Sequence, residues 1–220
     1  MLRRNLPLDC ARSRAEACAT AVARSIIFRV STGRQLKRIQ IDRYGGPEVI
    51  VRRDIAAPAP RPDEVLIRIS HAGINFMDVH TREGKYASSR TYPMKLPCTL
   101  GMEGAGEVVA VGAETADFKP GDRVAYCIVW GSYAEFAAVP AWRAVKVPDA
   151  LPLEMAAASL FHGFTAHYLV HDVARLAAGM TCLVHAASGG IGQILIQFAR
   201  RCGARVFATT STPDKAQVAR

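Results

Sequence analysis

A glycine-rich turn at residues 186–192 has the residue spacing of a phosphate-binding site. Aligned with the dinucleotide-binding pattern G-x-G-x-x-G, it places Ala187 first, followed by Gly189 and Gly192. A mostly apolar run at 182–185 predicts a strand before the turn. Helical spacing of apolar residues predicts a helix after it, with one packed face made of Ile191, Ile194, Leu195 and Phe198.

The start of that helix is the candidate ligand site. Its backbone N–H groups and positive dipole end suit a pyrophosphate, provided that no side chain blocks the approach, and glycine leaves the approach open. The candidate contacts are Ala187, Gly189, Gly190, Ile191 and Gly192. A tight strand-to-helix turn without a ligand is the alternative interpretation of these glycines.

The residues after the second predicted strand, 204–209, indicate which dinucleotide fits. Enzymes that use NAD usually place an Asp or Glu there, roughly 20 residues after the glycines, to bind the ribose hydroxyls. This chain has Thr210 and Ser211, followed by Lys215. Hydroxyls beside a cation suit a 2′-phosphate, so the sequence favours NADPH with these three residues as contacts. Asp214 is expected to cap the next helix.

Metal-binding residue types are present but poorly arranged. His167 and His171 have the i, i+4 spacing of a helical metal pair, yet no acidic third ligand accompanies them. The six cysteines contain no C-x-x-C pair, which suggests reduced thiols. We therefore predict no metal site, and a packed or surface role for both histidines.

The segment from Gly179 to Arg200 resembles the signature of the zeta-crystallin-like quinone oxidoreductases, within the medium-chain dehydrogenase/reductase superfamily. The matching positions are Gly179, Met180, Leu183, Ala187 to Gly190, Gly192, Gln197 and Arg200. Short-chain dehydrogenases also have a turn ending Gly-Ile-Gly, but theirs lies near the N-terminus and its first glycine would fall on Ala186. The resemblance covers residues 37–220.

Two further motifs carry the resemblance, at residues 73–78 and 101–106. In zinc alcohol dehydrogenases of this superfamily, the corresponding stretches supply a cysteine and a histidine to the catalytic metal. Asn75 and Met102 occupy these places here, and neither is a good zinc ligand. The resemblance therefore implies the zinc-free branch, in which the Lewis-acid route for polarising a carbonyl is absent. We interpret Glu103 as a structural polar residue in a glycine turn.

The resemblance also implies which residues lie near the reacting groups. Asn75 is expected beside the nicotinamide and Tyr86 in the quinone pocket, so these two are the candidate catalytic residues. A loop aromatic on the barrel is the alternative role for Tyr86. Thr165 matches a threonine that approaches the cofactor in relatives, although a helical threonine can also bond back to its own chain. His80 departs from relatives, which often have a second pocket tyrosine there.

Two predicted domains position these groups. Residues 37–150 contain many short strands separated by turns, with apolar residues alternating over 65–69, as in a compact β barrel or sandwich. Residues 151–220 begin with two predicted helices, at 153–160 and 164–176, and continue into the strand, glycine turn and helix. By resemblance the fold class is α/β, a GroES-like β-barrel domain followed by a Rossmann-type parallel sheet with about two strands present.

Charge and hydropathy exclude other classes of function. The net charge is +9, but residues 1–34 hold seven arginines against Asp9 and Glu16. The rest has no basic run with interleaved aromatics, so no nucleic-acid partner is expected. No run of about 18 apolar residues occurs, so no membrane insertion is expected. We interpret residues 1–36 as an N-terminal extension of a cytoplasmic protein or, alternatively, as a transit peptide to the mitochondrial matrix.

These features together predict NADPH-dependent reduction of quinones, with electrons passing from the nicotinamide to a quinone in a cleft between the domains. A metal-free enoyl or enal reductase of the same superfamily is the nearest alternative. A non-catalytic NADPH-binding protein of lens-crystallin or RNA-binding type is the alternative from another class. A homodimer of the full-length protein is compatible with either enzyme. Because 42 residues run from Gly179 to Arg220, we expect this chain to lack the second half of the dinucleotide site and to be inactive alone.

Overall fold

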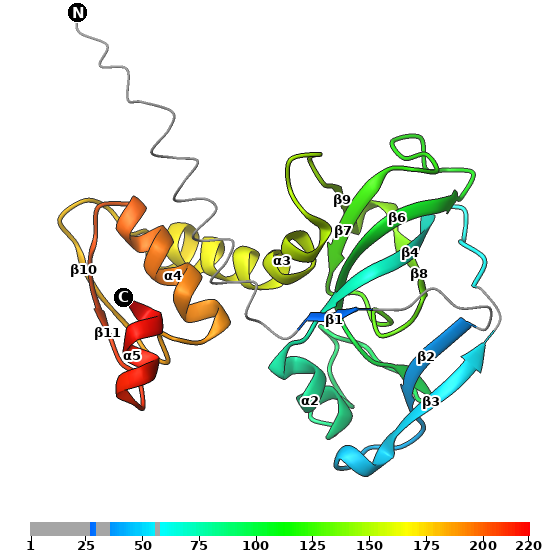
Figure 1. Cartoon of the computed structure of the whole chain (residues 1–220), viewed down its shortest axis with the longest axis horizontal. Coiled ribbons are helices and arrows are strands. Elements are labelled where there is room, and N and C mark those ends of the chain that lie inside the picture. Colours follow the sequence, from blue (N-terminus) through cyan, green and yellow to red (C-terminus); the bar gives the residue numbers. More distant parts are fainter. Residues whose placement is uncertain (1–26, 30–35, 56–57) are drawn as a thin grey trace, which may run out of the picture. The chain divides into compact units, whose positions relative to one another are not determined.

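The structure is a computed structural model that describes residues 27–29, 36–55 and 58–220. The described residues up to Phe161 form one compact unit, here called the N-terminal unit, and His162–Arg220 belong to another, the C-terminal unit (Figure 1). Most of the predicted extension at residues 1–36 lies outside the described residues. None of the described helices has the length and apolar content needed to cross a bilayer.

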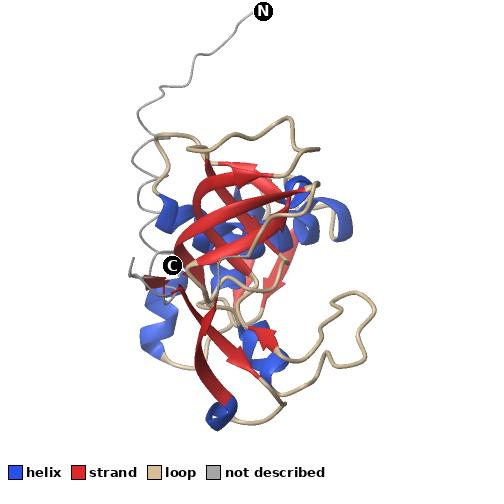
Figure 2. Ribbon diagram, turned by 90° about the vertical axis from the view of Figure 1, so that its right-hand side faces the viewer, coloured by secondary structure: helices blue, strands red, loops and turns tan. Residues whose placement is uncertain are grey.

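A curved antiparallel sheet forms the body of the N-terminal unit (Figure 2). Its path runs through β1 (Ile27–Arg29), β4 (Glu64–Gly73), β6 (Glu103–Val111), β7 (Arg123–Cys127) and β9 (Ala144–Lys146), and β4 also pairs with β8 (Phe136–Pro140). The predicted alternation over residues 65–69 is confirmed, because these side chains enter one buried cluster. Its members are Val65, Ile67, Ile69, Val108, Val124, Tyr126, Ala137 and Val139. Removing this apolar surface from water stabilises the unit.

A smaller antiparallel sheet belongs to the same unit. It consists of β2 (Leu36–Ile41), β3 (Ile50–Ile55) and β5 (Cys98–Thr99), with the 3-10 turn η1 (Pro47–Val49) before β3. The helix α2 (Phe76–Arg82) follows β4, and a second 3-10 turn, η2 (Ala141–Arg143), follows β8. Arg82 ties the end of α2 to the hairpin turn, because its Nε donates to the carbonyl of Gly45 at 3.1 Å.

One continuous helical segment replaces the two predicted helices at 153–160 and 164–176. The helix α3 spans Leu153–Tyr168, and the π-helical turn η3 follows at Leu169–Val173. The predicted interruption at 161–163 was wrong, since Gly163 alone weakens the helix there. One glycine costs a helix about 1 kcal/mol relative to alanine, which is too little to end a long helix.

The C-terminal unit contains the predicted strand, turn, helix and second strand. β10 (Thr181–Val184) and β11 (Arg205–Ala208) pair in parallel, α4 (Gly190–Arg201) connects them, and α5 (Pro213–Ala219) follows. A small core joins the helix to the strands, and its buried members are Val184, Ala187 and Ile196. This part of the secondary-structure prediction is therefore confirmed.

The packed face of α4 includes the predicted Ile194 and Leu195 but extends further than predicted. Ile196, which the prediction left out, is 4% exposed and packs against the strands. Phe198 instead packs against the rings of His167 and His171, with centroid distances of 6.2 and 6.3 Å. The helix contacts both the sheet and the preceding helical segment, so a single apolar stripe could not describe it.

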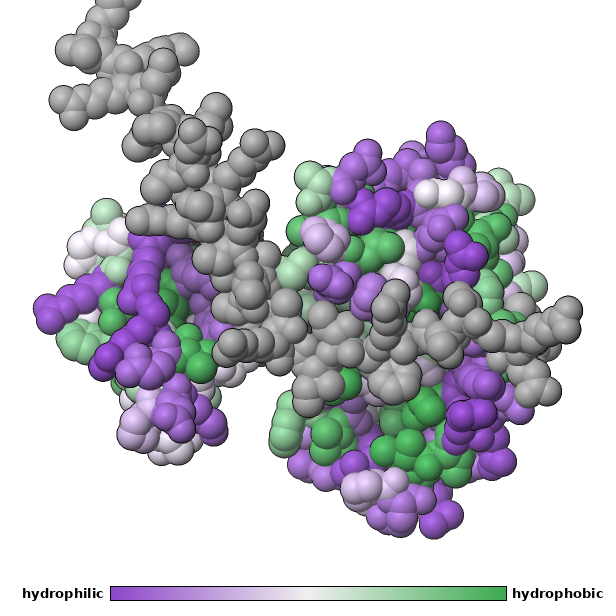
Figure 3. Space-filling model, in the orientation of Figure 1, coloured by the Kyte–Doolittle hydropathy of each residue, from purple (hydrophilic) through white to green (hydrophobic). Residues whose placement is uncertain are grey.

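One face of the small parallel sheet is left exposed. Figure 3 shows hydrophobic side chains interspersed among hydrophilic ones on the visible surface of each unit. Leu183 and Phe207 are partners in the parallel register and are 56% and 49% exposed. Side chains of directly paired residues point to the same face, so Leu183 and Phe207 share the face that α4 leaves bare.

Replacing Ile67 by alanine is expected to destabilise the N-terminal unit by about 2–5 kcal/mol, because its side chain is fully buried. The matched control is Ile50→Ala, which should cost less than about 1 kcal/mol because Ile50 is 41% exposed. Urea unfolding followed by tryptophan fluorescence measures both, since Trp130 and Trp142 lie in this unit. Equal losses for the two variants would contradict this assignment of the core.

Candidate functional site

The glycine turn of the C-terminal unit leaves hydrogen-bond donors unused at the start of α4. Gly189 is the N-cap of the helix, and no side chain caps it. The backbone N–H groups of Gly190, Ile191 and Gly192 have no hydrogen-bond partner among the described residues. Three free donors at the positive end of a helix dipole form a cradle for an anion such as phosphate.

The other two predicted turn contacts are used within the protein. The N–H of Ala187 donates to the carbonyl of Thr209 at 3.0 Å, and the N–H of Gly189 donates to the carbonyl of Ala186 at 2.9 Å. The Ala187 side chain is also fully buried. These two residues therefore shape the turn and fasten it to the end of β11, rather than offering free donors.

Glycine is needed at two of these positions for packing as well. A Cβ atom on Gly192 would lie 2.6 Å from the carbonyl oxygen of Ala186, and one on Gly190 would collide with the His162 ring. The turn thus brings α4 close to its own strand and to α3. Thr165 is half-buried and lies one helical turn after His162, on the same side of α3.

The polar residues after β11 lie at the same edge of the sheet as the glycine turn. Lys215 Nζ donates to Ser211 Oγ at 3.1 Å, so the predicted hydroxyl and cation are brought together. Thr210 Oγ1 donates to the carbonyl of Thr212 at 3.3 Å. The predicted cap at Asp214 was wrong, because Thr212 is the N-cap of α5 and its Oγ1 accepts from Lys215 N at 3.3 Å.

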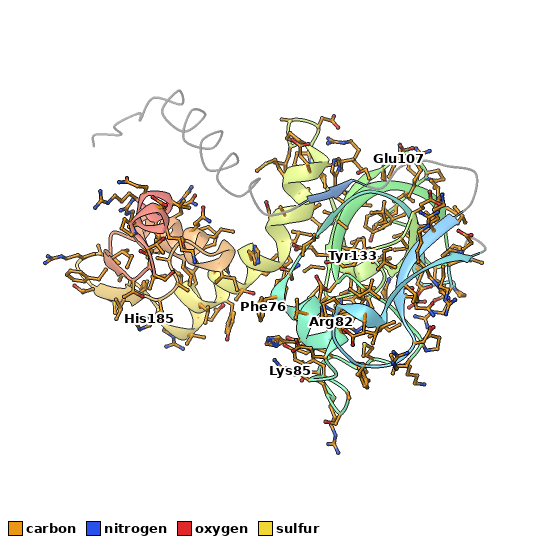
Figure 4. The ribbon with its side chains drawn as sticks, turned by 60° about the horizontal axis from the view of Figure 1, so that its bottom comes forward. Phe76, Arg82, Lys85, Glu107, Tyr133 and His185 are labelled. Carbon is orange, nitrogen blue, oxygen red and sulfur yellow. The ribbon has the colours of Figure 1, made fainter. Side chains whose placement is uncertain are left out.

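His185 is a member of this edge that the sequence did not single out for a function. Its side chain is labelled in Figure 4. Its Nδ1 lies 3.0 Å from Thr209 Oγ1, which links the residues after β10 to those after β11. The carboxyl ends of parallel strands meet at one edge, so motifs about 20 residues apart in sequence become neighbours. The sequence signal for His185 was its position at the end of the strand predicted over 182–185.

In the N-terminal unit, Asn75 belongs to a buried polar network. Its Nδ2 donates to Glu103 Oε1 at 3.2 Å, and Glu103 Oε2 accepts from the N–H of Phe161 at 2.8 Å. The N–H of Asn75 donates to Asp78 Oδ2 at 2.8 Å, and the Tyr133 hydroxyl donates to the same oxygen at 2.7 Å. Asn75 is 3% exposed and is the N-cap of α2, where its side chain and that of Asp78 have the arrangement of a capping box, yet its Oδ1 makes no hydrogen bond among the described residues.

Burial shifts the pKa values of both carboxyl groups in this network upwards. Desolvation raises the pKa of Glu103 to about 7, with the charge of Asp78 adding to the rise and the hydrogen bonds from Phe161 and Asn75 opposing it. Desolvation likewise raises the pKa of Asp78 to about 6, against the hydrogen bonds from Tyr133 and Asn75. Glu103 therefore changes between its neutral and charged forms near neutral pH, and the hydrogen bond that it can make with Asn75 changes with its charge.

Aromatic side chains gather around α2. The ring of His80 lies 4.9 Å from that of Phe76 and stacks on Tyr86 at 6.2 Å, and Tyr86 lies 5.7 Å from Tyr92. Phe76 is 76% exposed and projects from the start of α2 (Figure 4). The structure therefore brings Tyr86 and His80 together, whereas Asn75 lies at the opposite end of α2. The aromatic side chains offer flat surfaces on which a planar ring can stack.

The two positions that hold zinc ligands in zinc-dependent members of the superfamily are both buried here. Met102 is fully buried, and the Asn75 amide is engaged with Glu103. Within the part of the chain that the structure describes, no group of three His, Cys, Asp or Glu side chains is arranged to hold a metal. These residues offer an apolar thioether and a carboxamide, neither of which is a good zinc ligand.

Residues of both units match known proteins. Residues 61–149 match the alcohol dehydrogenase GroES-like domain. The quinone oxidoreductase of Pseudomonas aeruginosa is 43% identical over 185 residues, which are 84% of this chain and 55% of that protein. The structure of Escherichia coli quinone oxidoreductase complexed with NADPH is 36% identical, with a TM-score of 0.78 over 83% of this chain and 55% of that one. The quinone oxidoreductase structure from Pseudomonas syringae pv. Tomato is 41% identical, with a TM-score of 0.78 over 84% and 55%.

The chain spans about half the length of the relatives that it matches. Over that span the predicted fold class is confirmed, with a GroES-like β domain and a partial Rossmann-like sheet of few strands. The motif resemblance is likewise confirmed by the identity to these relatives. Over that span the chain is similar to the quinone oxidoreductases of these organisms, at 36–43% identity.

Proposed function

We propose that this chain carries the substrate domain and the first nucleotide-binding unit of an NADPH-dependent quinone oxidoreductase. The observation that carries the proposal is the set of three unused N–H donors, at Gly190, Ile191 and Gly192, beside the Ser211 and Lys215 pair. The donors suit a pyrophosphate, and the hydroxyl and ammonium suit a 2′-phosphate. The relatives named above support the same activity, which remains our proposal for this chain.

The N-terminal unit would supply the groups around the reacting rings. The buried Oδ1 of Asn75 lacks a partner among the described residues, so it fits a donor such as the NH2 group of a nicotinamide carboxamide. Tyr86 and His80 would stack on a flat quinone. NADPH would supply the electrons, while these residues would orient the ring and exclude water from it. Thr165 would contact the cofactor from α3.

Several other predictions remain proposals. The domain boundary is proposed near residue 150, with residues 37–150 and 151–220 as the two domains. A cytoplasmic location is proposed, with the mitochondrial matrix as the alternative. A quinone is the proposed substrate and a homodimer the proposed assembly, without nucleic-acid partners.

Activity is best tested in a chimera that continues this chain after Arg220 with the remaining sequence of the Pseudomonas aeruginosa relative. We expect it to oxidise NADPH with a quinone acceptor, measured as loss of absorbance at the dihydronicotinamide band. Gly192→Ala should abolish turnover because its Cβ would meet the backbone of Ala186 and Ala187. Gly163→Ala is the control, since no atom lies within 4 Å of its added Cβ.

The same assay separates the alternatives. Turnover of an α,β-unsaturated thioester in place of the quinone would replace the proposal with an enoyl reductase. Binding of NADPH without turnover of either acceptor would indicate a non-catalytic protein. Chimeric protein that is folded but binds no NADPH would exclude all three.

Lys215→Glu should lower the preference for NADPH over NADH. The change removes a charge-assisted contact to phosphate worth about 1.5–3 kcal/mol and adds repulsion, so the ratio of dissociation constants should change by roughly 10- to 100-fold. Arg201→Glu is the matched control, because Arg201 is an exposed cation in the last turn of α4, away from the turn. Calorimetric titration with both cofactors measures the ratio, and an unchanged ratio in Lys215→Glu would show that another residue recognises the phosphate.

A further inference from the structure

The orientation of the Asn75 carboxamide is imposed by its neighbour. Glu103 Oε1 accepts from Asn75 Nδ2 at 3.2 Å, while Glu103 Oε2 accepts from the N–H of Phe161 at 2.8 Å. An ionised carboxylate has only acceptors to offer. The amide must therefore turn its NH2 group toward Glu103, which leaves Oδ1 as the amide atom that Glu103 does not engage.

Glu103 is itself held in a fixed place. It is 1% exposed, and a Cβ atom on Gly73 would collide with its Oε1 and with the carbonyl of Ala157. The bond from the Phe161 N–H fixes the second carboxylate oxygen. With one oxygen committed to the backbone, Glu103 can serve Asn75 only through the other oxygen.

The free oxygen of Asn75 is the observation that points to a ligand. A buried carbonyl oxygen without a partner costs stability, and such atoms in folded proteins usually have a use. Asn75 Oδ1 is buried and has no partner among the described residues. Its natural complement is an N–H or O–H donor on the molecule that binds there.

We propose that Glu103 is a positioning residue that makes Asn75 present only an acceptor, so that Asn75 selects a ligand group with a hydrogen to donate. This inference rests on the proposed function, in which that group is the NH2 of the nicotinamide carboxamide. It also means that Asn75 does not donate to a quinone carbonyl. Asn75 serves cofactor recognition, and the substrate must be oriented by other groups.

The charge of Glu103 decides which way the amide turns. A protonated Glu103, or a glutamine in its place, can donate to Asn75 Oδ1 and let the amide turn its NH2 outward. The titratable groups that interact with Glu103 are Asp78 on α2, Tyr126 and Cys127 on β7, and Tyr133. Burial raises the pKa of both tyrosines and raises that of Cys127 to about 11, so Asp78 is the group among them that also changes charge near neutral pH.

The test compares NADP⁺ with its 3-acetylpyridine analogue, which keeps the carbonyl but replaces the NH2 by a methyl group. The protein is the chimera described above, titrated by calorimetry at about pH 8, above the pKa of Glu103. The unsubstituted chimera should prefer NADP⁺ by about tenfold or more, because the analogue leaves the Asn75 oxygen unpaired. Glu103→Gln should reduce that preference to less than about threefold. Glu107→Gln, the same change at a half-exposed position of β6, should leave it unchanged.

A second measurement needs no variant. In the unsubstituted chimera the preference should fall when the pH is lowered to about 6, below the pKa of Glu103, and this fall should be absent in Glu103→Gln. An equal preference in the unsubstituted chimera and Glu103→Gln, or a preference that does not change with pH, would overturn the inference. If neither nucleotide binds the unsubstituted chimera, the proposed function fails and this inference falls with it.

Discussion

Burying a carboxyl group is the constraint on which the N-terminal unit depends. Glu103 is almost fully buried, and its two oxygens bind the amide at the start of α2 and a backbone N–H in α3. Removing a carboxylate from water is costly unless hydrogen bonds replace the solvent. Strand β6, the start of α2 and the first part of α3 must therefore keep fixed positions relative to one another. Residue 73 must be glycine, because a Cβ atom there would collide with Glu103. The same constraint fixes which way the Asn75 amide points and leaves its buried Oδ1 without a hydrogen bond among the described residues.

The C-terminal unit brings its candidate phosphate-binding groups to one edge of a sheet although its hydrophobic core is small. Parallel pairing of β10 and β11 places the glycine turn and the hydroxyl residues at one edge. The bonds of Thr209 to Ala187 and His185 hold the two loops together. Backbone donors and a lysine therefore follow the carboxyl ends of the two described parallel strands, at one edge of the sheet, because both strands run in the same direction.

The sequence predicted what is local and missed what is long-range. The glycine turn, the strand alternation over 65–69 and the pairing of Ser211 with Lys215 follow from neighbours in the chain. The partners of Glu103 lie 28 and 58 residues away, so no periodicity or motif could reveal them, and Glu103 was interpreted only as a structural polar residue. The same limit explains the errors in the helices, because the faces of α4 and the continuity of α3 are decided by tertiary packing. The predicted cap of α5 was wrong for a local reason. Asp214 lies inside the first turn of the helix, whereas Thr212 occupies the N-cap position and its hydroxyl accepts the capping hydrogen bond.

The exposed face of the small parallel sheet affects how easily its two described strands open locally. β4 is paired with three other strands, whereas β10 and β11 have only each other among the described strands, and Leu183 and Phe207 remain exposed on one side. Few buried contacts mean a low free energy for local opening. Backbone amides in β10 and β11 should then exchange their hydrogens with solvent well before those of β4. A phosphate held by the N–H groups of the glycine turn would slow that exchange, so ligand binding would be visible as protection in the strands that carry the site.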